Sequence, residues 1–151
     1  MLDGLLVIHT TGVPIYYYRP DRLSKERDNN NVILFSGLLT AIQAFLKEVE
    51  IGEARIFETE KNLILIHPSK NYFITILIPL SKKGEMDTYS KLVNEINMAI
   101  KKWEKELDGL DVEVLSSFKG KAGKTLTEII KKWEKEASIP VVAKKLKECL
   151  W

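Results

Sequence analysis

The chain contains few of the residues that form disulfide bonds or structural metal sites. Of its 151 residues one is cysteine, Cys149, and two are histidine, His9 and His67. A single cysteine cannot form a disulfide within the chain, and this set cannot build a cysteine-rich zinc site. The longest apolar stretch, Phe73 to Leu80, is far shorter than the roughly 20 residues of a membrane-spanning helix. The sequence therefore predicts a cytoplasmic protein without a metal, neither secreted nor inserted in a membrane.

What the chain does contain is typical of a folded domain. Hydrophobic residues make up 45% and charged residues 29% of the sequence, close to globular averages. A chain of this length buries about two-thirds of its unfolded surface and needs no disulfide bond or structural metal. Abundant lysine and glutamate beside a single glutamine, Gln43, is a bias of heat-adapted proteins. We therefore expect one self-sufficient domain.

Signatures of catalysis are missing. Residues 123–125 read Gly-Lys-Thr, but a phosphate-binding loop also needs a glycine where this chain has Phe118. Ser36, His67 and Asp87 are the residue types of a catalytic triad, but any chain of this size contains such a combination, so it is no evidence of catalysis. Neither a nucleophile elbow nor a dinucleotide fingerprint is present. We interpret the protein as non-catalytic and without a cofactor; an enzyme of another type would need a convergent polar cluster that no motif reveals.

The first part of the chain predicts a hairpin. Two short apolar segments, Leu5–His9 and Val13–Arg19, are separated by a turn that contains Gly12. Because Pro14 cannot donate a ladder hydrogen bond, the second strand is expected at a sheet edge or to begin at this residue. Residues 20–31 are polar and charged and indicate a surface loop.

A long helix is predicted from Asn31 to Glu50, closed by Gly52. Its apolar residues recur at intervals of three and four, which indicates an amphipathic helix. The stripe is wider than one face, so we expect burial on two sides. The residues that form it are Ile33, Leu34, Phe35, Leu38, Leu39, Ala41, Ile42, Phe45, Leu46 and Val49.

Three further strands are predicted at Ala54–Thr59, Leu63–His67 and Tyr72–Ile78. The links between them are too short for a parallel crossover, so this part of the chain is an antiparallel meander. The last strand is apolar on both faces, which marks a central strand covered from both sides.

Helices follow. The spacing predicts an amphipathic helix from Met86 to Leu107, and another from Leu126 to Ala137 that breaks at a proline and resumes from Val141 to Leu150. Between them, residues 110–124 contain Gly120 and Gly123 and are interpreted as a connector.

A short motif occurs twice in these helices. Residues 100–106 and 130–136 share the sequence Ile-Lys-Lys-Trp-Glu-Lys-Glu. The isoleucine and the tryptophan are three residues apart and share one helix face. Our main interpretation is two helices that pack a tryptophan inward; the alternative is an exposed tryptophan that anchors a partner.

The end of the chain is rich in lysine. Residues 119–147 hold nine lysines and three glutamates, without arginine. Lysine alone gives a generic positive field rather than bidentate recognition of bases or phosphates, so no nucleic-acid partner is expected. A solvated helix face is the main interpretation, and weak peripheral contact with an anionic membrane or an acidic partner is the alternative.

The order of elements resembles the longin domain of the roadblock/longin, or SNARE-like, superfamily. The similarity covers most of residues 4–107. It is carried by the opening hairpin, residues 5–15 (Leu-Leu-Val-Ile-His-Thr-Thr-Gly-Val-Pro-Ile), the helix segment, residues 35–42 (Phe-Ser-Gly-Leu-Leu-Thr-Ala-Ile), and the strand block Ile64 to Ile78. Roadblock domains usually begin with a helix, whereas this chain begins with strands, so the longin branch is more similar.

The resemblance implies an α+β fold of the longin/profilin type. In it, a five-stranded antiparallel sheet of order 2-1-5-4-3 carries one helix on one face and the C-terminal helices on the other. Residues 1–109 would form the longin-like core, and residues 110–151 a basic connector and helical extension packed on it.

The resemblance also implies a function. Members of this superfamily are non-catalytic interaction platforms that dimerise and bind small GTPases or trafficking and membrane-associated complexes. The first helix and an edge strand are their frequent contact surfaces, which here would be the helix Leu34–Val49 and the strand Ile15–Arg19 or Ala54–Thr59. The candidate interface residues here are Phe35, Leu38, Leu39, Ile42, Tyr16 and Tyr18.

A small-molecule sensor of the PAS or profilin-like kind has a similar sheet and remains an alternative. It would require a closed apolar pocket, whereas a platform requires an exposed apolar surface.

Overall fold

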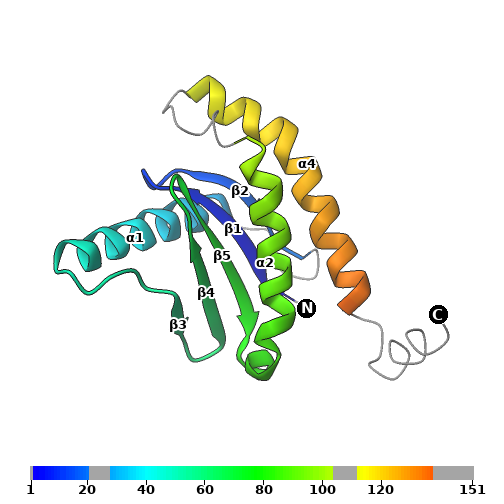
Figure 1. Ribbon diagram of the computed structural model, residues 1–151, viewed down its shortest axis with the longest axis horizontal. Helices are drawn as coiled ribbons and strands as arrows, with labels where there is room; N and C mark the ends of the chain where they lie inside the picture. The colour runs from blue at the N-terminus through cyan, green and yellow to red at the C-terminus, as the bar shows by residue number, and fades with distance from the viewer. Residues whose placement is uncertain (1, 21–27, 104–111, 138–151) are drawn as a thin grey trace.

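The computed structural model describes residues 2–20, 28–103 and 112–137 (Figure 1). In the described part, five strands and three α-helices follow one another with a short 3₁₀ helix before α2. Their bounds are β1 Gly4–His9, β2 Pro14–Tyr18, α1 Asp28–Glu48, β3 Ile56–Glu58, β4 Asn62–Pro68, β5 Tyr72–Pro79, η1 Leu80–Glu85, α2 Met86–Lys101 and α4 Val112–Ala137.

The strands form one antiparallel sheet in the order β2-β1-β5-β4-β3. This confirms the predicted α+β fold and its strand order, with β5 central between β1 and β4. Pro14 is the first residue of β2, at one edge of the sheet, where its missing N–H costs no ladder bond. Gly12 has φ +97° in the turn before it, a conformation that glycine adopts without strain.

Side chains of successive strand residues alternate between the two faces. On one face, Leu5 and Val7 of β1 and Ile74 of β5 belong to the large core cluster, to which α2 and α4 contribute. On the other face, Leu6 and Ile8 join a smaller cluster that includes Leu39 of α1. The sheet therefore lies between a two-helix layer and a one-helix layer, as Figure 1 shows.

Helix α2 is amphipathic as predicted. It buries Tyr89, Leu92, Val93, Ile96 and Ile100, which recur at intervals of three and four. The helix ends at Lys101, earlier than the predicted Leu107, and residues 104–107 lie outside the described part of the chain.

The predicted connector at residues 110–124 is wrong, because α4 begins at Val112 and continues through Gly120 and Gly123. Each glycine inside a helix costs about 1 kcal/mol relative to alanine. Packing of a buried stripe outweighs this cost, since most helix stability in proteins comes from tertiary contacts. The stripe consists of Ala122, Leu126, Ile130 and Trp133.

Trp133 joins the two helices of this layer. Its ring lies 5.2 Å from that of Tyr89, and its Nε1 donates to the carbonyl oxygen of Thr88 at 3.1 Å. Trp103, in the other copy of the repeated motif, is half-buried against the same core. Both tryptophans therefore pack inward, which confirms the main interpretation of the repeat. The resumed helix predicted from Val141 to Leu150 lies outside the described residues.

None of the helices in the described ranges has the length and apolar character that crossing a bilayer requires.

Candidate interaction surface

Helix α1 packs apolar side chains against the sheet and also leaves large apolar side chains in solvent. Leu39 is buried in the smaller cluster, and Val32 and Phe35 are half-buried against it. On the outward side of the helix, Leu34, Leu38 and Phe45 are 71%, 62% and 61% exposed. The outward side of a surface helix is normally polar. Helix α1 therefore has more apolar surface than the protein's own core covers.

Local hydrogen bonds allow polar residues of this helix to face the sheet as well, of which Ser36 and Gln43 are buried. The Ser36 hydroxyl donates to the carbonyl oxygen of Val32 at 2.7 Å, and the Thr40 hydroxyl donates to that of Ser36 at 2.8 Å. Buried polar groups without such partners would cost several kcal/mol. Since these hydroxyls are satisfied within the helix, their burial is tolerated.

An apolar groove separates α1 from β3. Its volume is about 220 Å³, enough for one or two side chains of a partner. Beside the exposed Leu38, Phe35 and Ile42 line its helix side and Phe57 its strand side. The full lining is Phe35, Leu38, Leu39, Ile42, Phe57, Glu58, Thr59 and Ile64.

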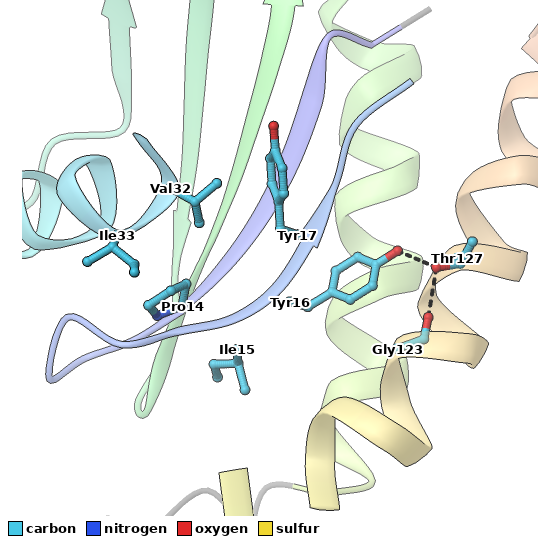
Figure 2. Close-up of a pocket in the computed structure, with 8 residues that line it drawn as sticks. All are labelled: Pro14, Ile15, Tyr16, Tyr17, Val32, Ile33, Gly123 and Thr127. Carbon is cyan, nitrogen blue, oxygen red and sulfur yellow. Dashed lines mark hydrogen bonds between the residues drawn. The ribbon is translucent and has the colours of Figure 1, made fainter. Parts of the chain in front are cut away.

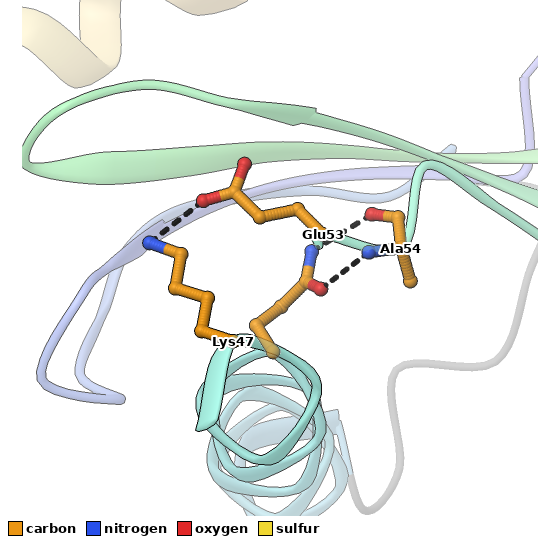
Figure 3. A network of polar contacts seen from close by, with 4 residues as sticks. Lys47, Glu53 and Ala54 are labelled. Carbon is orange, nitrogen blue, oxygen red and sulfur yellow. Dashed lines mark hydrogen bonds and ion pairs between the residues drawn. The ribbon is translucent and has the colours of Figure 1, made fainter. Parts of the chain in front are cut away.

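A polar tether fixes the segment between α1 and β3 (Figure 3). The Gln43 side-chain amide donates to the carbonyl oxygen of Ala54 at 2.8 Å and accepts from its N–H at 2.7 Å. One turn further along the helix, the Lys47 ammonium lies 2.7 Å from a Glu53 carboxylate oxygen. Since Gln43 is buried and its two bonds are reciprocal, it holds the two walls of the groove at a fixed distance.

We expect Gln43→Ala to lower the free energy of unfolding by about 1–3 kcal/mol, because it leaves both backbone groups of the half-buried Ala54 without their partner. Urea denaturation followed by circular dichroism measures the change. Lys47→Ala is the matched control in the same tether, with an expected loss under about 1 kcal/mol because its ion pair is largely exposed. Equal losses in the two variants would contradict the role given to Gln43.

Beyond the groove, β3 is an edge strand. It pairs with β4 on one side, and on its other side the described chain adds no further strand. Such an edge offers free N–H and C=O groups to another chain. Ile56, 53% exposed on this strand, adds apolar surface at the same edge.

Comparison with known proteins bears on the fold. No family model and no curated protein sequence matches the chain. Among solved structures, the mammalian SRP receptor superposes with a TM-score of 0.54 at 11% identity, over 91% of this chain and 98% of that chain. The likeness extends over nearly the whole chain and shows that the fold is longin-like.

Two roadblock-type structures match more locally. Myxococcus xanthus MglB has a TM-score of 0.42 at 11% identity and covers 53% of this chain. A roadblock/LC7 domain from Streptomyces avermitilis has a TM-score of 0.40 at 10% identity and covers 52%. The match spans 66%, just under two thirds, of each of these two chains.

The candidate interface residues lie at two separate places in the structure. Phe35, Leu38, Leu39 and Ile42 line the α1–β3 groove together. Leu39 forms its floor, because it is 3% exposed and packs against the sheet. The outward surface is thus provided by Leu38 and its neighbours along α1.

Tyr16 and Tyr18 lie away from this groove, at the edge formed by β2. The hydroxyl of Tyr16 is 2.6 Å from Thr127 Oγ1, and that of Tyr18 donates to Glu134 Oε2 at 3.1 Å. Burial raises the pKa of Tyr16, and its hydrogen bond to Thr127 offsets part of this rise. Both tyrosines therefore contact α4 of their own chain.

A larger hollow of about 730 Å³ opens beside β2, between α1 and α4 (Figure 2). Val32 and Ile33 line it on one side and Gly123 and Thr127 on the other. It adjoins the segment that joins β2 to α1, and residues 21–27 of that segment lie outside the described part of the chain. We therefore assign no site to it.

The described residues hold no group of three or more histidine, cysteine, aspartate or glutamate side chains suited to a metal ion. His9 is buried in the first hairpin, where its Nδ1 lies 2.8 Å from Thr11 Oγ1. His67 is half-buried on β4.

Sequence reasoning missed Gln43 at this surface. Gln43 carried a signal, because a glutamine among apolar residues on a helix face suggests a buried hydrogen bond. The strand that holds Ile56 and Phe57 was indicated by the resemblance to longin domains, which predicts contacts at an edge strand.

Proposed function

We propose that this protein is a non-catalytic interaction platform. It binds other proteins through the α1–β3 surface, which comprises the outward side of α1 (Leu34, Leu38 and Phe45), the groove and the free edge of β3. The large apolar side chains on the outward side of α1 are the observation that supports this most strongly. Contiguous exposed apolar surface is uncommon on monomers and marks interaction sites.

The proposal includes a dimer formed through this surface. The outward sides of the two α1 helices would cover each other, and the free edge of β3 would stay open to a different partner. A two-fold interface of this kind uses the same patch on both subunits. It would bury Leu34, Leu38 and Phe45, which are large apolar side chains now in water.

Light scattering coupled to size exclusion tests the dimer. We expect the wild-type chain to be a dimer, and Leu38→Glu to weaken association by about 30-fold or more, as removal of an interface hot spot does. Met98→Glu is the matched control, because Met98 is an equally exposed apolar residue on α2. A wild-type chain that is monomeric at every concentration, or a Leu38→Glu variant that dimerises normally, would contradict the dimer.

We also propose a small GTPase or a trafficking-type complex as heterologous partner. The longin-like fold supports this class of partner, and the α1–β3 surface provides apolar contacts for it. In a co-elution experiment with a purified small GTPase, binding by the wild-type chain and loss of binding by Leu38→Glu would support it. Binding that is unaffected by Leu38→Glu would contradict the use of this surface.

A sensor function has less support. Three hollows on the described surface each open to solvent. One lies between α1 and β3, one lies beside β2, and a third lies between the β3–β4 pair and α2. A sensor would need an enclosed apolar cavity. Stabilisation by a nucleotide or metabolite in a thermal-shift screen would favour it.

A further inference from the structure

A second, smaller hollow lies at the same edge of the sheet, on the face that α2 covers. Its volume is about 200 Å³. Its walls are apolar, and Arg55, His67, Ser90 and Asn94 supply polar groups. The full lining is Arg55, Ile56, Leu65, Ile66, His67, Met86, Ser90, Val93 and Asn94. We call it the basic niche.

The positive charges of Arg55 and Lys101 act on this hollow. Burial lowers the pKa of His67, and the positive charges of Arg55 and Lys101 lower it further. In the described part of the chain, no carboxylate forms an ion pair with Arg55, His67 or Lys101. Like charges held close together favour the binding of an anion.

The nearby acidic residues are already engaged. A Glu58 oxygen lies 2.7 Å from Lys83 Nζ, and a Glu53 oxygen lies 2.7 Å from Lys47 Nζ. Neither carboxylate neutralises the niche. Among the described residues, the positive charge of Arg55 therefore has no carboxylate partner, and His67, whose lowered pKa keeps it neutral, adds a hydrogen-bonding group and not a charge.

The free edge of β3 runs between the niche and the groove. Arg55 accepts from the Ile66 N–H at 2.8 Å, and the Thr59 N–H donates to Asn62 at 2.8 Å. Because hydrogen-bonded and non-bonded positions alternate in an antiparallel pair, the backbone groups of Ile56 and Glu58 point away from β4. They are the groups with which an added strand would pair.

An added strand would place its side chains alternately on the two faces of the sheet. Those on one face would enter the apolar α1–β3 groove beside Phe57. Those on the other face would lie beside Ile56, within reach of the basic niche. The two hollows therefore favour different side chains at alternate positions of one added strand: apolar side chains in the α1–β3 groove and acidic side chains in the basic niche.

We propose that a partner protein adds an extended acidic segment to the free edge of β3, with apolar side chains in the α1–β3 groove and carboxylates in the basic niche. This rests on the proposed function and names the chemistry of the partner. Recognition combines backbone pairing, which is independent of sequence, with pockets that select alternate side chains.

Fluorescence anisotropy with labelled eight-residue peptides tests this inference. We expect a peptide of alternating valine and glutamate to bind at least about tenfold more tightly than one of alternating valine and serine, because charge-assisted hydrogen bonds are about twice as strong as neutral ones. The double variant Arg55→Gln/His67→Gln should abolish this preference, so that the glutamate peptide binds no more tightly than the serine peptide. Lys91→Gln, on the solvent side of α2, is the matched control.

Lys101→Glu, at the exposed end of α2, provides a second test that does not alter the walls of the niche. It should reduce the preference for the glutamate peptide. Equal affinities of the two peptides, or a preference that survives both niche variants, would overturn the inference.

Leu38→Glu separates this inference from the proposed function. If it weakens both peptides while neither is preferred, only the basic niche is wrong. If it affects neither peptide, the α1–β3 surface itself is wrong.

Discussion

Replacing Trp133 by alanine is expected to lower the free energy of unfolding by about 3–5 kcal/mol, the usual cost of removing a large buried aromatic side chain. Trp133 is 6% exposed in the main core. It contacts the ring of Tyr89 and donates to the carbonyl oxygen of Thr88, so its loss affects the contact between α2 and α4 as well as the core. Urea denaturation followed by fluorescence and circular dichroism measures the change.

Trp133→Phe is the control for this prediction. It keeps an aromatic ring against Tyr89 and loses the hydrogen bond to Thr88, so we expect a smaller loss, about 1–2 kcal/mol. A loss below about 1 kcal/mol in Trp133→Ala, the average for ordinary substitutions, would show that α4 does not belong to the cooperative core.

Leu39→Glu is expected to destabilise the fold by about 3–5 kcal/mol. The substitution removes a buried leucine and places a carboxylate between α1 and the sheet, and both changes are costly. Leu39 contacts Leu6, Ile8 and Phe73 in the smaller cluster, so these residues would lose their cover. Thermal and urea denaturation of the purified variant measure the effect.

Leu38→Glu is the matched control, one residue away on the same helix. Leu38 is mostly exposed, so its effect on stability should stay within about 0.5 kcal/mol. The two variants therefore separate folding from association. Comparable destabilisation by both would mean that α1 has a different orientation on the sheet.

The sheet was predictable because its signals are local or follow from the order of elements. Short links between β3, β4 and β5 permit only antiparallel pairing, and Pro14 is compatible with an edge strand or with the first position of a strand, both of which β2 shows. The pairing of β1 with β5 has no local signal. It came from the resemblance to longin domains.

The orientation of α1 was not predictable from its sequence. The apolar stripe is so wide that either side could face the sheet, and Ser36 and Gln43 argue against the side that is in fact buried. Their hydrogen bonds to Val32 and Ala54 make that burial acceptable. Only the three-dimensional arrangement shows these partners.

The start of α4 and the contacts of two tyrosines were not predictable for a related reason. Glycines at positions 120 and 123 argue against a helix on propensity, yet α4 packs along its buried stripe. Tyr16 and Tyr18 form hydrogen bonds with Thr127 and Glu134, more than a hundred residues away in the sequence. Pairs so distant leave no local pattern.

The strand order also has a kinetic consequence. The β1–β2 hairpin and the β3–β4–β5 meander each pair strands that are neighbours in the sequence, so each can form early and alone. The β1–β5 pairing, in which Leu6 lies opposite Thr75, joins these two units across the whole of α1. Closing such a long loop costs entropy before its contacts form. We therefore expect the folding rate to depend on the docking of two preformed halves along the centre of the sheet.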